Sequence, residues 1–232
     1  MKINYSMIED STKIYRLSKI VDIPSGIDSM CISPEKKFVA VGRIDGSLEI
    51  WTSDTWIQLV KIPGIKGNMN YNLDCDLRKI FFKKKNKEEN SDNLNNLRLF
   101  SIGLNGYVLE WCLVENKQKL TYENPGESAI WDCDLINNKI LLIACEDGSP
   151  RSLQIKKNII LLNKQFSKQN SKILSIKSNS FDNHNTFFTG HNDGNIKKWN
   201  YLNGQIELII NLNSNKIKND YSLLIWSLFI PK

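Results

Sequence analysis

Histidine is scarce in this chain, because only His184 and His191 occur among its 232 residues. A hydrolase triad or a histidine-based zinc centre needs a histidine at a fixed spacing from its partners, and neither histidine has such a partner nearby in the sequence. The chain also lacks a Walker loop, a GxGxxG after a strand and an HExxH. We therefore predict two solvated loop histidines in a protein that is not an enzyme, with no catalytic residues, no metal site and no cofactor.

Cysteine is also used sparingly, and the five cysteines form no CxxC pair. A disulfide framework or a tetrahedral zinc cluster would need closer, paired spacing, so we expect reduced thiols packed within strands. No apolar run approaches the roughly 18 residues of a membrane span, and the first residues lack the apolar core of a signal peptide. These absences favour a soluble protein of the cytosol or nucleus.

Charge of one sign is not strongly in excess. Lysine and arginine number 31 against 25 acidic residues, which gives a formal net charge of +6. Such a balance permits contact with nucleic acid without requiring it. A hydrophobic content of 41% is enough to bury a substantial core, and nothing in the length excludes a single domain.

What the sequence does contain is a pattern that occurs four times. In each copy an apolar run ends in a small residue, an Asp-Gly or Asn-Gly pair follows, and an aromatic or aliphatic residue stands five positions after the glycine. Such pairs suit a type I′ turn, in which both central residues need positive φ, so each copy is predicted to be a β-hairpin. The turn and packing residues are Asp45, Gly46 and Trp51; Asn105, Gly106 and Trp111; Asp147 and Gly148; and Asp193, Gly194 and Trp199.

The spacing of the copies indicates the architecture. Gly106 to Gly148 is 42 residues, Gly148 to Gly194 is 46, and Gly46 to Gly106 is 60, or 46 once the polar run Lys83 to Asn96 is removed. A period in the forties, with a hairpin that ends in tryptophan, is typical of WD-repeat blades of four antiparallel strands. We predict an all-β fold, a WD-repeat β-propeller that is incomplete and has four blades plus the first strand of a fifth.

The predicted domain is 14–232, preceded by a flexible amino terminus, 1–13, and interrupted by a disordered polar insert, 83–96. The run 14–20 is assigned as a strand that helps to close the ring, and Pro150 is expected to shorten a strand or to cause a bulge. The predicted strands are 27–33, 37–42, 47–51 and 57–62 in blade one; 69–76, 97–102, 107–111 and 119–122 in blade two; 129–135, 139–145, 149–155 and 159–166 in blade three; 173–177, 186–190, 195–199 and 206–211 in blade four; and 223–230.

Four blades and one strand would leave the propeller ring open, with sheet edges exposed. We expect the chain to be the amino-terminal part of a longer protein or a truncated gene model. An open arc that partners complete is the less favoured alternative, because it would keep those edges exposed.

Two groups of residues are candidates for binding. Trp131 and Trp226 lie in matching first strands near the central channel and form a candidate partner surface, whereas the repeated Trp51, Trp111 and Trp199 are interpreted as packing residues. The candidate RNA contacts are lysines of two loops, Lys83, Lys84, Lys85, Lys87, Lys168 and Lys172, whose ammonium groups can neutralise phosphates without reading sequence. A solvated insert, partly balanced by its own acidic residues, is the simpler interpretation of the first loop.

Five segments of the sequence resemble the cirhin family of WD-repeat proteins. They are Ile23-Pro24-Ser25-Gly26-Ile27, the run Arg43 to Ile50, the run Leu99 to Gly106, the run Ile140 to Ser149 and the run Gln169 to Ile176. These segments are in order and in register, so that the match extends from about residue 20 to 230. Generic WD repeats would share the turns but not Pro-Ser-Gly-Ile or Gly-Leu-Asn-Gly.

The resemblance implies a non-catalytic scaffold of the nucleolus. Members of the family belong to the small-subunit processome associated with U3 small nucleolar RNA, which acts in pre-18S ribosomal RNA processing and early small-subunit assembly. The implied partners are other propeller proteins of the early subcomplex and the precursor ribosomal RNA leader, with no membrane and no small-molecule substrate. The family is far longer than this chain, and the run Lys83 to Asn96 has no recognised counterpart in it.

Two other functions remain open at this point. The chain could be an adaptor propeller that reads a peptide or a protein partner at its central channel, as in ubiquitin-ligase or chromatin complexes. An enzyme would require an activity that depends on His184 or His191, which we do not expect.

Overall fold

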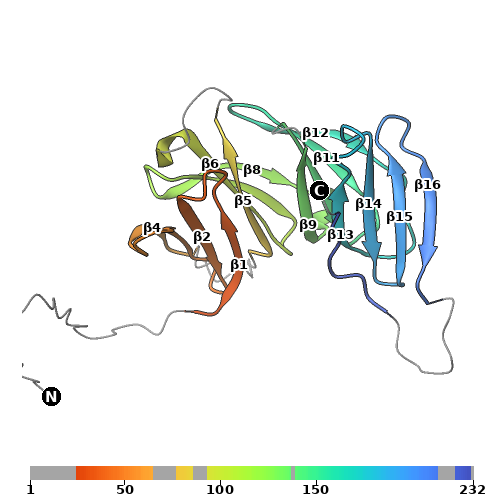
Figure 1. Ribbon diagram of the computed structural model, residues 1–232, viewed down its shortest axis with the longest axis horizontal. Coiled ribbons are helices and arrows are strands. Elements are labelled where there is room, and N and C mark those ends of the chain that lie inside the picture. Colours follow the sequence, from red (N-terminus) through yellow and green to blue (C-terminus); the bar gives the residue numbers. More distant parts are fainter. Residues whose placement is uncertain (1–24, 65–76, 86–92, 137–138, 214–222, 231–232) are drawn as a thin grey trace, which may run out of the picture.

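The computed structural model describes residues 25–64, 77–85, 93–136, 139–213 and 223–230. Within them the chain forms four antiparallel sheets of four strands, which lie side by side in an arc (Figure 1). This is the predicted all-β architecture of a partial propeller. The predicted terminal segment 1–13, the strand 14–20 and Lys87 lie outside the described residues.

Each sheet is formed by four consecutive strands, and two short 3-10 helices join strands of the second and third sheets. The first sheet contains β1 (Ile27–Ile32), β2 (Phe38–Arg43), β3 (Leu48–Thr52) and β4 (Gln58–Ile62). The second contains β5 (Lys79–Lys84), η1 (Leu94–Asn96), β6 (Leu97–Ile102), β7 (Tyr107–Cys112) and β8 (Lys117–Glu123), and η2 (Pro125–Glu127) follows. The third contains β9 (Ile130–Ile136), β10 (Ile140–Cys145), β11 (Arg151–Ile155) and β12 (Ile160–Gln165). The fourth contains β13 (Ile173–Ser178), β14 (Thr186–His191), β15 (Asn195–Asn200) and β16 (Ile206–Asn211).

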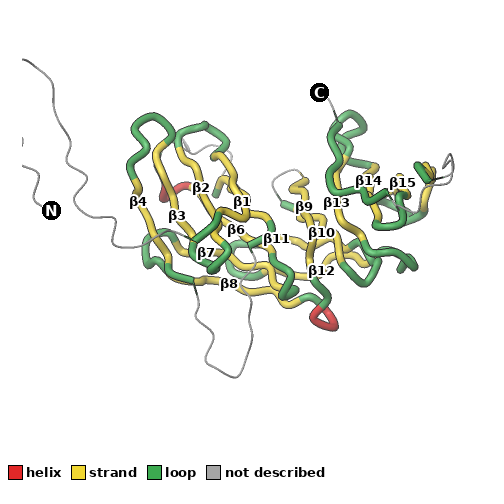
Figure 2. The backbone as a smooth tube through the Cα atoms, turned by 90° about the horizontal axis from the view of Figure 1, so that it is seen from below, coloured by secondary structure: helices red, strands yellow, loops and turns green. Residues whose placement is uncertain are grey.

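The first strands β1, β5, β9 and β13 lie next to one another on the inner side of the arc, and Figure 2 shows the same succession of sheets from below. Because strands alternate their side chains between two faces, a sheet in this position can bury both faces. Three apolar clusters fill the spaces between neighbouring sheets, with Leu48 and Ile50 in the first, Phe100 in the second, and Phe187 and Trp199 in the third. All five of these side chains have less than 2% of their surface exposed.

The hairpin turns differ from the predicted type I′. In the first sheet Gly46 N–H donates to Arg43 O over 2.9 Å and Arg43 N–H donates to Ser47 O over 2.9 Å. Gly46 has a φ of +76°, but Asp45 is not among the residues with positive φ. This is a type I turn followed by a glycine bulge, and the three other copies repeat the bond to the glycine. The acidic or amide side chain caps the turn instead, since Asp45 Oδ1 accepts from Ser47 N–H over 2.9 Å.

The start of the second sheet corrects the prediction. Its first strand is β5 (Lys79–Lys84), not 69–76, which lies outside the described residues. Ile80 and Phe82 alternate into the first apolar cluster, so the flanking lysines belong to a strand. The predicted insert therefore begins too early at Lys83, and its last residues form η1.

The other predicted strands agree with the structure to within a few residues, and β11 begins directly after Pro150, as a short strand. The segment 223–230 is the exception, because it has no strand assignment. A strand needs a ladder of backbone hydrogen bonds, and within the described chain this segment has the bond from Ile225 N–H to His191 O, of 3.2 Å. Ile225 O also accepts from Ser175 Oγ over 2.9 Å, so the segment lies beside β13 and β14.

Candidate functional site

A pocket of about 430 Å³ lies where the inner strands meet the segment 223–230. Its walls come from the four inner strands or their flanks and from that segment: Asp28, Arg78, Lys79, Trp131, Asp132, Leu174, Ile176, Lys177, Trp226, Ser227, Leu228 and Phe229. The two predicted tryptophans are in contact, with ring centroids 5.8 Å apart at 64°. The Arg78 guanidinium lies 5.0 Å from the Trp131 ring, which is a cation–π distance.

Aromatic surface is available in this pocket. Trp226 is 54% exposed and Phe229 is 83% exposed. Exposed aromatic side chains next to charged ones are typical of protein interaction sites, because they contribute contact area and polar anchors together. The pocket is therefore suited to a peptide or a protein side chain, and its role as a partner surface stays a prediction.

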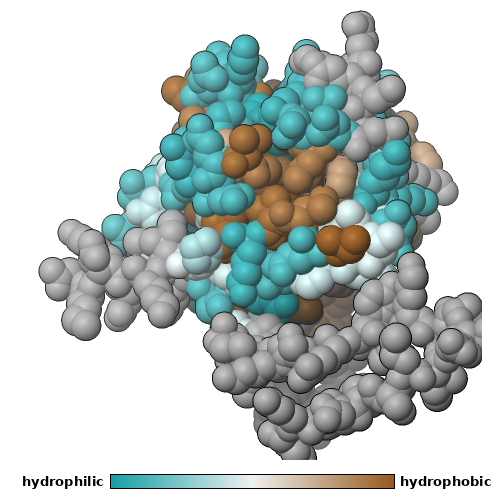
Figure 3. Space-filling model, turned by 90° about the vertical axis from the view of Figure 1, so that its left-hand side faces the viewer, coloured by the Kyte–Doolittle hydropathy of each residue, from teal (hydrophilic) through white to brown (hydrophobic). Residues whose placement is uncertain are grey.

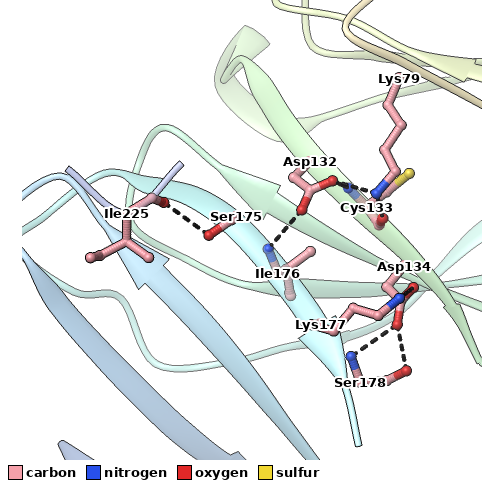
Figure 4. A network of polar contacts seen from close by, with 9 residues as sticks. All are labelled: Lys79, Asp132, Cys133, Asp134, Ser175, Ile176, Lys177, Ser178 and Ile225. Atoms are coloured by element: carbon pink, nitrogen blue, oxygen red, sulfur yellow. Dashed lines mark hydrogen bonds and ion pairs between the residues drawn. The ribbon is translucent and has the colours of Figure 1, made fainter. Parts of the chain in front are cut away.

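Two aspartates on β9, Asp132 in the pocket lining and Asp134 two residues further along the strand, bond to the neighbouring sheets (Figure 4). Asp132 accepts from Lys79 Nζ over 2.6 Å and from Ile176 N–H over 2.9 Å, so it links β5, β9 and β13. Asp134 accepts from Lys177 Nζ over 2.7 Å and from Ser178 N–H over 2.9 Å. Both carboxylates are occupied by these bonds, which makes them part of the sheet-to-sheet packing rather than free acids.

The candidate RNA-contact lysines fall into two groups that the structure does not bring together. Lys83, Lys84 and Lys85 lie at the end of β5 that leads toward β6, whereas Lys168 and Lys172 follow β12, at the end of the sheets that carries the Asp-Gly turns. A strand of six residues separates these ends by roughly 20 Å.

The environments of these lysines also differ. Lys84 pairs with Glu35 and Lys172 pairs with Glu146. Lys83 is only 7% exposed, whereas Lys85 and Lys168 are exposed. The described lysines therefore do not form one uniform, flexible basic loop.

Sequence reasoning missed a second group of basic residues at the Lys83 end. A cleft between the second and third sheets is lined by Lys83, Lys85, Arg98, Lys119, Lys139, Gln154, Ile155, Lys156, Lys157 and Asn158. The turns β9–β10 and β11–β12 contribute Lys139 and the pair Lys156-Lys157. In a four-stranded blade these two turns share one end, and that rule could have grouped them with Lys83.

His191 corrects the prediction of a solvated loop histidine. It is the last residue of β14 and has no exposed surface. Trp199 Nε1–H donates to Thr189 Oγ1 over 2.8 Å, and the same hydroxyl is hydrogen-bonded to His191 Nε2, also 2.8 Å away. His191 Nδ1 is hydrogen-bonded to Ser171 Oγ over 2.8 Å, so both ring nitrogens have a hydroxyl partner.

This chain of bonds ties β14 and β15 to the connection that precedes β13. Burial, followed by the charge of Lys197, lowers the pKa of His191 from its ordinary 6.5 to about 4. A neutral, fully enclosed imidazole of this kind is a packing element. His184 lies in the β13–β14 connection, half-buried, with Nδ1 3.2 Å from Ser178 Oγ.

The repeated tryptophan position is filled differently in each sheet. Trp199 and Trp111 are buried, and Trp111 Nε1–H donates to Ser101 Oγ over 2.8 Å, which matches the Trp199 bond to Thr189. Trp51 is half-buried and donates to Glu49 Oε2 over 3.1 Å. The third sheet has Leu153 in this position, with no exposed surface.

The cysteines of the described residues, Cys31, Cys112, Cys133 and Cys145, are free thiols. Burial raises the pKa of Cys31 and Cys133 to about 12 and that of Cys145 to about 11, so these three stay protonated at neutral pH. The described ranges hold no cluster of three or more His, Cys, Asp or Glu side chains that could ligate a metal ion. They also hold no helix that is long and apolar enough to cross a membrane.

Comparisons with known proteins support a WD-repeat relationship. The model of the WD domain, G-beta repeat family matches residues 18–52. The U3 small nucleolar RNA-associated protein 4 of Schizosaccharomyces pombe is 28% identical over 230 residues, which cover 92% of this chain and 29% of that protein. Its Homo sapiens homologue is 29% identical over 166 residues, or 71% of this chain and 21% of that protein. The chain thus spans less than a third of these relatives.

Solved structures support the fold alone. The crystal structure of the RRP9 WD40 repeats aligns with a TM-score of 0.62 at 13% identity, over 82% of this chain and 52% of that one. The computationally designed Ika8 protein aligns with a TM-score of 0.56 at 20% identity, over 78% of this chain and 48% of that one.

Proposed function

Because this chain is a homologue of U3 small nucleolar RNA-associated protein 4 with WD40 repeats, we propose that it is a non-catalytic scaffold subunit of the small-subunit processome. In this role it acts in pre-18S ribosomal RNA processing and early small-subunit assembly, in the nucleolus. Its partners are other propeller proteins of the early subcomplex and the precursor ribosomal RNA leader.

The observation that carries this proposal is the extent of the similarity. The match to the Schizosaccharomyces pombe relative covers 92% of the chain and so extends over all four sheets. It is therefore not confined to a single repeat. The geometry is compatible with a scaffold, because the described histidine and aspartate side chains of the inner strands and their neighbours bond to other parts of the fold. The His191 chain of bonds and the two β9 aspartates are the clearest instances.

Purification of the tagged endogenous protein under gentle conditions tests the proposal. We expect precursor ribosomal RNA leader and several other propeller proteins to be enriched together with it. Recovery of a single protein partner without enriched RNA would overturn the processome role.

The pocket beside Trp131 favours a second candidate function, an adaptor that binds a peptide or a protein at the central channel. Trp226→Ala removes exposed aromatic surface from that pocket without opening a buried cavity. An adaptor would lose its one dominant partner in this variant, whereas a processome scaffold would keep most of its set of partners.

A further inference from the structure

The cleft between the second and third sheets has a volume of about 750 Å³ and an unusual lining. Seven of its ten residues are lysine or arginine, and none of the ten is acidic or aromatic. The cations come from β5, β6, β8 and the two turns of the third sheet, so five separate segments direct positive charge toward one space.

Glu110 compensates only part of this charge. Its carboxylate accepts from Arg98 Nε over 2.8 Å and Nη2 over 2.5 Å, and Lys119 Nζ lies 3.2 Å away. Within the part of the chain that the structure describes, the other five lysines of the cleft form no ion pair. They are Lys83, Lys85, Lys139, Lys156 and Lys157.

Lys83 is the lysine of the cleft whose charge has the least favourable surroundings. It is 7% exposed and lies in the cleft wall beside Arg98. Burial, followed by the charge of Arg98, lowers the pKa of Lys83 below the ordinary lysine value. A buried cation next to another cation costs stability unless an anion approaches it. Arg98 already has Glu110 as its partner, and the charge of Glu110 offsets part of the effect on Lys83. An anion in the cleft would compensate the rest, since Lys83 itself has no ion-pair partner among the described residues.

We propose that this cleft binds the phosphate backbone of a single-stranded RNA, through Lys83 and the exposed lysines on both of its walls. The proposal rests on the proposed function, because that function supplies RNA as the polyanion. Cations spread along two walls fit phosphates spaced along a strand better than one compact anion. The absence of aromatic side chains among the lining residues removes base stacking, so binding is blind to sequence.

The test uses the full chain and a fluorescent RNA of about 20 nucleotides with mixed sequence, because a strand of that length reports several phosphate contacts. Anisotropy titrations over a range of salt concentrations compare wild type with the double variant Lys156→Glu and Lys157→Glu. Both lysines are exposed turn residues, so the fold should tolerate the change. We expect affinity to fall at least about tenfold near 0.1 M salt, and the salt slope to fall by about 1.4, or 0.7 for each lost contact.

A matched control reverses two exposed lysines that do not line the cleft, Lys36 and Lys61, with the same change in net charge. Affinity should be nearly retained in this control. An equal loss in both double variants would overturn the cleft as the site. A milder pair, Lys156→Gln with Lys157→Gln, should give an intermediate loss, and full affinity in it would also count against the cleft. Thermal unfolding of each variant checks that the fold is kept.

A second experiment distinguishes RNA from a small polyphosphate as the ligand of the cleft. If inositol hexakisphosphate binds in a manner that depends on Lys156 and Lys157 while the RNA does not bind, the occupant is a small polyphosphate and the RNA proposal fails. Failure of the proposed function is distinguishable from both results. It would appear as the absence of processome components in the purification, whatever the cleft binds in vitro.

Discussion

At the scale of single residues, Glu110 sets the charge balance of the basic cleft. Its carboxylate is 2% exposed and bonds to Arg98, which is 7% exposed. Removing one partner of a buried ion pair leaves the other charge without compensation. The same carboxylate also opposes any incoming phosphate, so it stabilises the fold and weakens the proposed binding.

We therefore predict opposite effects of Glu110→Gln on stability and binding. The free energy of unfolding, measured by urea denaturation, should fall by about 3 kcal/mol because Arg98 stays buried without its partner. RNA affinity, measured by anisotropy, should rise. Glu115→Gln is the control, because the Glu115–Lys117 pair is exposed and should change neither quantity. Weaker RNA binding by a folded Glu110→Gln would contradict the cleft.

The lowered pKa of His191 makes the stability of the fold depend on pH. Its pKa is about 4 in the folded protein and about 6.5 when unfolded, so the unfolded chain takes up a proton first as the pH falls. Stability is then lost between pH 6.5 and 4, by up to about 3 kcal/mol at 1.36 kcal/mol per pH unit. Denaturation at pH 7 and pH 5 should show a smaller difference in His191→Gln than in wild type. His184→Gln is the control, and an unchanged difference in His191→Gln would refute the prediction.

At the scale of elements, the hairpins were predictable because each has its signals within a few residues. Asp45-Gly46 and its three counterparts fix where the second and third strands meet. The turn type was not predictable from the dipeptide alone, because a type I turn with a glycine bulge uses the same residues with one fewer positive φ. Strand β5 was missed for another reason: Lys83 and Lys84 continue into a polar run, which hides the alternation of Ile80 and Phe82.

The candidate sites were predictable only in part, since their residues meet through packing between sheets. Trp131 and Trp226 were grouped by their matching positions in the repeat, and their rings are in contact, but their role as a partner surface stays a prediction. His191 was misread because polar neighbours in the sequence suggested a loop, whereas its ring lies between Ser171 and Thr189. The basic cleft was missed because Lys83 was assigned to a polar insert rather than to the end of strand β5, which lies at the same end of the blades as the turns that carry Lys139 and Lys156.

The contact between the third and fourth sheets supplies a prediction at this scale. Asp132 and Asp134 each accept a backbone N–H of β13, from Ile176 and Ser178 respectively. Asp134→Ala should leave the Ser178 amide without a partner and destabilise the chain by about 1–3 kcal/mol. Hydrogen exchange should accelerate at Ser178 more than at Ile176, and Asp132→Ala should reverse that order. If hydrogen exchange accelerated equally at both amides in both variants, each aspartate would not be protecting its own bonded amide, and the prediction would be wrong.

At the scale of the whole molecule, the arc ends in two apolar sheet faces. Figure 3 shows apolar surface gathered on the side where the first sheet lies. Met30 and Ile32 on β1 are 65% and 53% exposed, and Ile210 on β16, which pairs with Ile196, is 43% exposed. In the interior of the arc, each sheet packs one such face against the next sheet. The open face of the first sheet in one molecule and the open face of the fourth sheet in another could therefore pack together as neighbouring sheets do within the arc.

Two complementary faces on one molecule predict head-to-tail association. Sedimentation velocity of the chain alone should show growing species as concentration rises. Met30→Lys and Ile210→Lys each remove one half of the contact, so either variant alone should stay monomeric with unchanged stability, because both side chains are exposed. Val114→Lys, at a 71% exposed turn residue, is the control and should still associate.

Mixing the two variants gives the decisive result. The Met30→Lys chain keeps its fourth-sheet face and the Ile210→Lys chain keeps its first-sheet face, so one heterodimer forms and growth then stops. Separate variants that associate as strongly as wild type would show that these faces are not used. A mixture that stays monomeric would show that the two faces do not recognise each other, and that the apolar surface of each end requires a different partner.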